Sequence, residues 1–123
     1  MGLDMYLFKR TKGTDDKWQE VMYWRKANQI RAWFNEALNS VENCKFHSVT
    51  KEILEGLVKD CKHVLTFPDD AYTVMPTSSG FFFGSTEYDE WYFSDLKETI
   101  EEVTKVINET NWDTEEVVYH EWW

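Results

Sequence analysis

The chain is poor in the residues that cross-link a small protein or anchor it in a membrane. Only two of its 123 residues are cysteines, Cys44 and Cys61, and in a reducing compartment we expect both to be free thiols. No apolar run approaches the roughly 20 residues needed to cross a bilayer. The first ten residues, MGLDMYLFKR, lack the basic and apolar regions of a signal peptide. We therefore expect a cytoplasmic protein that makes no membrane contact.

Motifs of catalysis and of cofactor binding are also missing. The sequence contains no GxSxG, HExxH or Walker pattern. His47, His63 and His120 fall in different predicted elements. Cys44, His47, Cys61 and His63 are zinc-type ligands, but Cys61 and His63 point about 200° apart on a predicted helix, so they cannot share one ion. We expect a non-enzymatic protein with no metal and no cofactor.

Basic residues are scarce in the last third of the chain. Residues 1–86 hold eleven acidic and eleven basic side chains, whereas residues 87–123 hold twelve acids against Lys97 and Lys105. The net charge of −10 therefore belongs to the C-terminal third. Such a surface repels nucleic acid, whose phosphates are bound by cations. It favours proteins with basic surfaces, such as nucleic-acid-binding proteins, as partners.

Hydrophobic periodicity predicts the main elements. Alternation over residues 3–9 and 115–123 predicts strands, the former with an aliphatic face of Leu3, Met5 and Leu7, and residues 20–25 look extended. Helical spacing predicts helices over about 28–39, with Asn28 as N-cap, over about 51–66 behind the cap Thr50, and over about 89–109. Phe81-Phe82-Phe83, between two glycines, is predicted to be a buried strand. We expect the first and last strands to lie in one sheet, with this segment beside them. The segments 40–49 and 66–80 are predicted to be irregular.

These elements define a fold class. With 42% hydrophobic and 17% aromatic residues, the chain is long enough to form one globular domain over residues 1–123. We predict a single two-layer α+β domain, in which a small, mostly antiparallel sheet of about three or four strands is covered by about three helices. Most of the aromatic side chains are expected in the core, with Trp122 and Trp123 as the main exceptions.

The first candidate site is the acidic side of the last predicted helix. Its carboxylates recur at i, i+3 and i+4 spacing, which places them about 5–6 Å apart in a row that imitates a phosphate backbone. The candidate protein-binding residues are Glu90, Glu98, Glu101, Glu102 and Glu109, together with Tyr88 and Trp91. The alternative is an ordinary solvated helix face.

The second candidate site lies in the basic and aromatic segment YWRKANQIR. An aromatic ring can stack on a nucleotide-type ligand while neighbouring cations pair with its phosphates. The candidate anion-binding residues are Arg10, Trp24, Arg25, Lys26 and Arg31. The alternative is that these cations pair with the acidic C-terminal third of the same domain.

Several segments resemble a family of small uncharacterised phage and prophage proteins of Gram-positive bacteria. The resemblance is carried by MGLDMYLFKR, EVMYWRKANQIRAWF, VTKEILEGL and PTSSGFFFGSTEYDEWYFSDLKETIE, and covers most of the chain. The chain departs from the family in a shorter segment over residues 11–19 and in the ending HEWW. The label phosphoglycerate kinase sometimes given to such proteins does not fit, because that kinase is several times longer and has glycine-rich nucleotide contacts.

The resemblance implies a phage accessory protein that binds a host factor. Combined with the acidic charge, it favours a counter-defence inhibitor, for example of a CRISPR nuclease. The alternatives are a protein that sequesters a nucleotide-type small molecule and a structural or packaging accessory.

Overall fold

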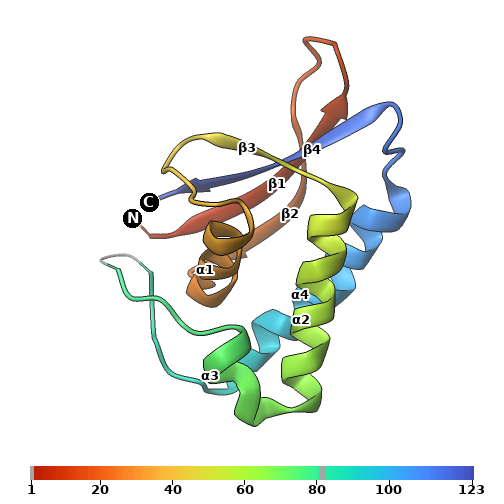
Figure 1. Ribbon diagram of the computed structural model, residues 1–123. Helices are drawn as coiled ribbons and strands as arrows, with labels where there is room; N and C mark the ends of the chain where they lie inside the picture. The colour runs from red at the N-terminus through yellow and green to blue at the C-terminus, as the bar shows by residue number, and fades with distance from the viewer. Residues whose placement is uncertain (1, 81–82) are drawn as a thin grey trace.

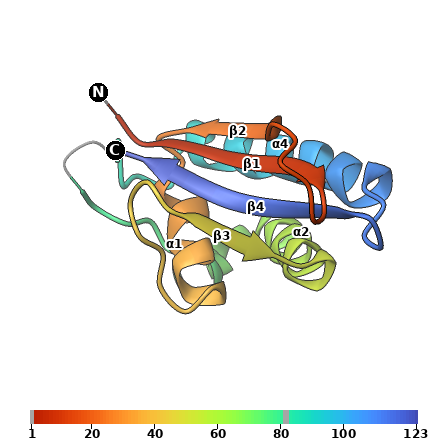
Figure 2. The same cartoon turned by 90° about the horizontal axis from the view of Figure 1, so that it is seen from above.

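The computed structural model describes residues 2–80 and 83–123. In this part of the chain one four-stranded sheet is covered on one face by helices (Figures 1 and 2). The strands are β1 (Asp4–Thr11), β2 (Gln19–Arg25), β3 (Phe46–Val49) and β4 (Glu115–Trp122). The helices are α1 (Asn28–Ala37), α2 (Lys51–Thr66), the short 3-10 helix η1 (Pro68–Asp70), α3 (Ala71–Val74) and α4 (Glu90–Glu109). The predicted α+β fold class is confirmed.

The sheet is antiparallel throughout, in the order β2-β1-β4-β3. β1 pairs with β4 along its whole length, from Asp4 opposite Trp122 to Thr11 opposite Glu115. The two ends of the chain therefore lie close together (Figure 1). The prediction that the first and last strands share one sheet is confirmed.

The predicted position of one strand of the sheet is wrong. The triple-phenylalanine segment was predicted to join the sheet, but Phe81 and Phe82 lie outside the described residues, and Phe83 is buried outside any strand. The strand is β3, in a segment predicted to be an irregular connector. Four residues are too few to give a readable alternation, and β3 is specified by pairing with the free edge of β4.

A side-chain cap marks the start of two of the three longest helices, α2 and α4. The hydroxyl of Thr50 accepts a hydrogen bond from the Ile53 amide at 3.1 Å, as predicted for the start of α2. The carboxylate of Asp89 accepts from the amides of Trp91 and Tyr92, both at 3.1 Å, at the start of α4. The prediction of Asn28 as N-cap of α1 is wrong: Ala27 holds that position, and Asn28 bonds to a distant loop instead.

The core lies between the sheet and the helices. Leu3, Met5 and Leu7 are fully buried, which confirms the aliphatic face predicted for the first strand. On β4 the ring of Tyr119 stacks on Phe34 of α1, with centroids 4.2 Å apart. No helix in the described part of the chain is long and apolar enough to span a bilayer.

The opposite face of the sheet is open and lined with rings. Figure 2 looks onto this face, with the helices behind it. The rings that stack or touch there are Tyr6, Phe8, Trp18, Tyr23, Phe46 and His120. Trp122 and Trp123 are exposed as predicted, but more of the aromatic side chains lie outside the core than expected.

Candidate functional site

The five candidate glutamates lie on the solvent side of α4. The helix buries Tyr92, Leu96 and Val103 against the core, so its 3.6-residue repeat turns the glutamates outward. We call Glu90, Glu98, Glu101, Glu102 and Glu109 the α4 acidic face; it extends about 28 Å at 1.5 Å per residue. Of these five glutamates, only Glu102 forms an ion pair with another described residue, Lys105, whose Nζ lies 3.3 Å from its carboxylate. The charge of the row is therefore largely uncompensated by the described residues.

Two aromatic residues at the start of α4 differ in their availability. Trp91 is 72% exposed, so its indole is free to meet a partner. Tyr88 is half-buried: its ring stacks on Tyr72 with centroids 5.5 Å apart, and its hydroxyl accepts a hydrogen bond from the Thr77 amide at 3.2 Å. Tyr72, which is 75% exposed, extends this aromatic patch. Tyr72 was not predicted as a candidate, because residues 66–80 were expected to be irregular, whereas η1 and α3 turn this side chain outward.

The residues of the anion-binding hypothesis do not form one site. Trp24 is only 3% exposed and donates its indole hydrogen bond to Thr99 Oγ1 at 2.8 Å. It cannot stack on a ligand, because its ring belongs to the core. Of the five candidates, Arg25 and Lys26 are the two that line a common hollow.

The arginines of that hypothesis pair within the domain. Arg10 lies over the ring of Trp18 at 4.0 Å and bonds to Glu116 at 3.2 Å. Arg31 bonds to Glu121. Both acids belong to the C-terminal third, as the alternative interpretation predicted. Arg25 differs, because it pairs with Asp4 of β1 at 3.2 Å.

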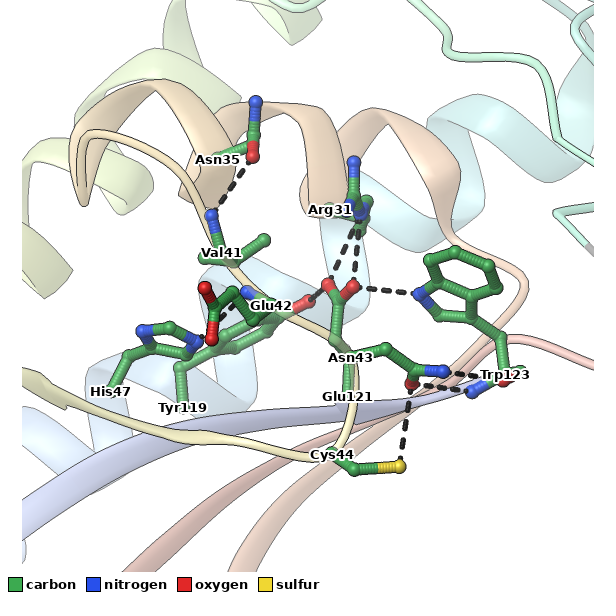
Figure 3. A network of polar contacts seen from close by, with 10 residues as sticks. All are labelled: Arg31, Asn35, Val41, Glu42, Asn43, Cys44, His47, Tyr119, Glu121 and Trp123. Atoms are coloured by element: carbon green, nitrogen blue, oxygen red, sulfur yellow. Dashed lines mark hydrogen bonds and ion pairs between the residues drawn. The ribbon is translucent and has the colours of Figure 1, made fainter.

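The Arg31–Glu121 pair is the centre of a buried polar network (Figure 3). Glu121 is fully buried, and both of its oxygens lie 3.1 Å from Arg31 Nε. Tyr119 Oη donates to the same carboxylate at 2.9 Å, and Trp123 Nε1 donates at 2.7 Å. Burial, followed by the negative charge of Glu121, holds the pKa of Tyr119 well above its ordinary value. This network joins α1, β4 and the end of the chain, so its role is structural.

A hollow of about 250 Å³ lies between the end of β2, the start of α1 and the start of α4. The lining residues come from four segments: Arg25, Lys26, Gln29, Thr77, Gly84, Ser85, Glu87, Asp89, Trp91, Tyr92 and Asp95. We call it the Lys26–Asp95 hollow. It brings together residues from both candidate sites, the cations Arg25 and Lys26 and the indole of Trp91.

Asn28 holds one wall of this hollow in place. Its side chain is buried and donates to the carbonyls of Phe83 at 2.9 Å and Ser85 at 2.8 Å. Its carbonyl oxygen accepts from the Ser78 amide at 2.9 Å. One amide side chain thus ties both arms of the 76–89 loop to α1. The sequence signal was an amide at the start of a helix, which favours an N-cap.

Asp95 is a half-buried carboxyl with a perturbed affinity for protons. Burial raises its pKa from 3.8 to about 6, Glu98 and Asp89 add to the rise, and a hydrogen bond from Gln29 opposes it. That hydrogen bond is long, 3.4 Å from Gln29 Nε2 to Asp95 Oδ2. The carboxylate is therefore poorly solvated and poorly paired when ionised.

Replacing Asp95 with asparagine is expected to stabilise the protein by about 1 kcal/mol at neutral pH and to change little at about pH 4. Because the native pKa lies above the unfolded one, wild-type stability falls as pH rises from about 4 to about 6 and then stays constant. The full difference between the two pKa values corresponds to about 3 kcal/mol, which solvent screening reduces. Urea unfolding at both pH values measures this. Glu101→Gln, on the exposed side of the same helix, is the control; an Asp95→Asn effect equal at both pH values would contradict the prediction.

A larger hollow of about 500 Å³ lies beside α1 and is lined by Arg31, Trp33 and Asp60 among others. Two of its three charged groups already have partners, because Arg31 is held by Glu121 and Asp60 accepts from Trp33 Nε1 at 2.8 Å. The third is the carboxylate of Glu36, so the hollow offers a ligand few charged groups.

The thiols Cys44 and Cys61 are both free, the first exposed and the second buried. In residues 2–80 and 83–123 no group of three or more metal-binding side chains gathers.

Scans against protein-family models, curated proteins and solved structures each find nothing that matches this chain. The resemblance to small phage proteins therefore stays a prediction.

Proposed function

We propose that this protein is a non-enzymatic binding protein whose α4 acidic face docks on a basic surface of another protein. The observation that carries the proposal is the unpaired state of that face. Four of its five glutamates have no ion-pair partner among the described residues, although basic side chains elsewhere in the chain pair with acids. Uncompensated charge of one sign raises the encounter rate with an oppositely charged partner.

The aromatic patch next to this face supports the same function. Trp91 and Tyr72 are each more than 70% exposed and lie at the start of α4 and on α3. Exposed tryptophan and tyrosine side chains are common anchors of protein interfaces, and charged residues around them select the partner. The combination of an apolar anchor and a row of carboxylates is better suited to binding a protein than to binding an isolated cation.

On the resemblance to phage and prophage proteins, we further propose that the partner is a nucleic-acid-binding protein of a Gram-positive host. The carboxylates of α4 then occupy a groove that otherwise holds phosphates, as in inhibition of a CRISPR nuclease. The α4 acidic face suits this role because its charges lie along one side of the helix over about 28 Å.

Reversing Glu98, Glu101 and Glu102 to lysine is expected to weaken binding to the partner about tenfold or more at low salt, because three favourable charge contacts become unfavourable. Wild-type binding is expected to weaken as the salt concentration rises. The measurement is surface plasmon resonance at several salt concentrations with the captured partner.

The matched control reverses Asp15, Asp16 and Glu20, three exposed acids on and beside the β1–β2 loop. It changes the net charge by the same amount but leaves the α4 acidic face intact. Equal losses in the two variants would mean that overall charge, not this face, determines binding.

A further inference from the structure

The open face of the sheet carries a hydrophobic cluster of its own (Figure 2). We call its rings the ring face: Tyr6, Phe8, Trp18, Tyr23, Phe46 and His120. Val118 of β4 points to the same side, because it lies opposite Phe8, and it is buried although it does not belong to the core cluster. The rings around it therefore shield it from water. The chain thus forms hydrophobic contacts on both sides of its sheet.

Stacking between flat groups holds the ring face in a fixed arrangement. Trp18 directly precedes β2, and Phe46 belongs to β3 at the opposite edge of the sheet. Their ring centroids are nevertheless 5.7 Å apart and their planes differ by 18°, so Trp18 reaches across β1 and β4. Arg10 lies over Trp18 at 4.0 Å, and Phe46 stacks on His120 with centroids 4.7 Å apart. Rings that are already ordered lose little conformational entropy when a partner docks.

The ring face remains partly open to solvent. Tyr23 is 38% exposed and Phe46 is 53% exposed, and Trp122, which β4 directs to the same side, is 61% exposed. At about 150–250 Å² for a whole aromatic side chain, these three residues alone expose about 300 Å². The half-buried rings add to this area. The largest apolar patch on a monomeric protein is typically about 300–600 Å² and is often an interaction site.

The charges around the ring face are nearly balanced. Arg25 pairs with Asp4 at one end of the sheet, at 3.2 Å. Arg10 pairs with Glu116 at the other end, also at 3.2 Å. Glu20 of β2 lies on the same face and has no ion-pair partner among the described residues. Two arginines against three acids give this face a charge of −1, whereas the whole chain carries −10.

This balance of charge restricts the kind of partner. A nucleic acid needs free cations for its phosphates, and both arginines of this face are already paired. A strongly basic or strongly acidic protein gains little from a surface whose charge is close to zero. The suitable partner is an apolar protein surface with balanced charge. The same face of a second copy has this composition, and its ion pairs at both ends offer charges of each sign to the other copy.

The edges of the sheet are poorer docking surfaces than its face. Val21 of β2 has no partner on β1, where the register of the pair shifts between Leu7 and Phe8. Such an irregularity at an edge disrupts the row of backbone groups that another strand would need. At the other edge, β3 has only four residues. Two copies therefore have little to gain from joining their sheets edge to edge.

We propose that two copies of this chain associate through their ring faces into a symmetric dimer. β1 and β4 have eight residues each and are about 26 Å long, and four strands about 4.8 Å apart span about 19 Å. The outline of the face is thus about 500 Å², and the relief of its side chains brings it towards the roughly 800 Å² of accessible surface that each partner of a standard interface buries. The two sheets pack face to face, about 10 Å apart.

This arrangement also separates the acidic surfaces of the two copies. The helices cover the opposite side of each sheet, so both α4 acidic faces lie on the outside of the dimer (Figure 2). A contact through the helices would instead bring the two acidic faces together and be opposed by like-charge repulsion. The dimer does not depend on the docking of α4 to another protein, because the two surfaces lie on opposite sides of the sheet.

The test is analytical ultracentrifugation of the full chain from about 1 µM to about 500 µM, where we expect a dimer with a Kd of about 10 µM or tighter. Hydroxyl-radical footprinting of the wild type at both ends of this range identifies the surface. Phe46 and Trp122 should become protected in the dimer, whereas the exposed Tyr72 of α3 should stay reactive. A monomer mass throughout, or a dimer in which Phe46 and Trp122 stay reactive, would overturn the proposal.

Glutamate substitutions test the same surface independently. Phe46→Glu and Trp122→Glu should each weaken dimerisation at least about tenfold, because symmetry places the new acid on both copies and the ring is lost. Phe67→Glu is the matched control: Phe67 is about as exposed as Phe46 but lies at the end of α2, so its variant should dimerise like the wild type. Circular dichroism checks that each variant is folded. Equal dimerisation of all three variants would overturn the assignment of the ring face.

Discussion

Replacing Arg31 with methionine is expected to lower the free energy of unfolding by about 3–5 kcal/mol. The methionine stem can fill much of the space of the arginine, so the loss comes from charge. Glu121 is fully buried, and Arg31 supplies the only cation that bonds to it among the described residues. The hydrogen bonds from Tyr119 and Trp123 remain in the variant but do not neutralise the carboxylate. A buried charge without its counter-charge is among the most costly defects in a protein core.

Urea unfolding at neutral pH measures this effect. The double variant Arg31→Met/Glu121→Gln should recover most of the loss, because it buries no uncompensated charge. Arg10→Met is the control for removing an arginine of a partly exposed pair, and it should cost about 1 kcal/mol or less. If Arg31→Met cost no more than Arg10→Met, the network in Figure 3 would not be a major source of stability.

Replacing Asn28 with alanine is expected to cost about 2–4 kcal/mol, since three hydrogen bonds of a buried side chain are lost together. The substitution also affects the 76–89 loop, because this side chain supplies hydrogen bonds between the loop and α1. We expect faster proteolytic cleavage within that loop, because its carbonyls and the Ser78 amide lose their protein partner. Urea unfolding and limited proteolysis of the folded variant measure the two effects.

Asn35→Ala is the matched control. Its side-chain oxygen accepts one hydrogen bond, from the Val41 amide at 3.0 Å, so it should cost about 1 kcal/mol and leave the 76–89 loop protected. A loss of similar size in both variants, without faster cleavage of that loop in Asn28→Ala, would contradict the role assigned to Asn28.

Much of the fold was predictable because strong local patterns agree with the tertiary structure. The apolar stripe of α2 is unbroken, and its cap is a threonine that bonds to the third residue beyond it. The alternation of Leu3, Met5 and Leu7 identifies the buried face of β1 directly. In such segments propensity, periodicity and capping lead to the same structure, so the sequence alone suffices.

The predictions failed where contacts between distant parts of the chain determine the local structure. β3 has four residues and forms at an edge of the sheet, and no local sequence pattern predicts a strand there. Asn28 was assigned to its own helix by capping preference, although its partners lie about 50 residues away in the chain. Its function depends on where a distant loop returns, and a single sequence carries no signal for that return.

The candidate sites show the same division. The α4 acidic face was predicted correctly as an exposed row, because helix periodicity alone places it. The residues of the basic segment do not form one site, because adjacent residues of a strand point to opposite faces of the sheet. Trp24 enters the core while Arg25 faces outward. Gln29 and Asp95 were missed because their pairing joins α1 to α4. For Asp95, the one available signal was its position next to Leu96, at the border of the apolar stripe of the helix.

The most direct test of the proposed function is a quantitative affinity capture from lysate of a Gram-positive host at low salt. Three baits are compared by mass spectrometry: wild type, the Glu98/Glu101/Glu102 reversal and the Asp15/Asp16/Glu20 reversal. The proposal predicts a basic protein retained by wild type and by the loop reversal, released at high salt, and lost with the α4 reversal. A partner retained equally by all three baits, or no protein that distinguishes them, would contradict it.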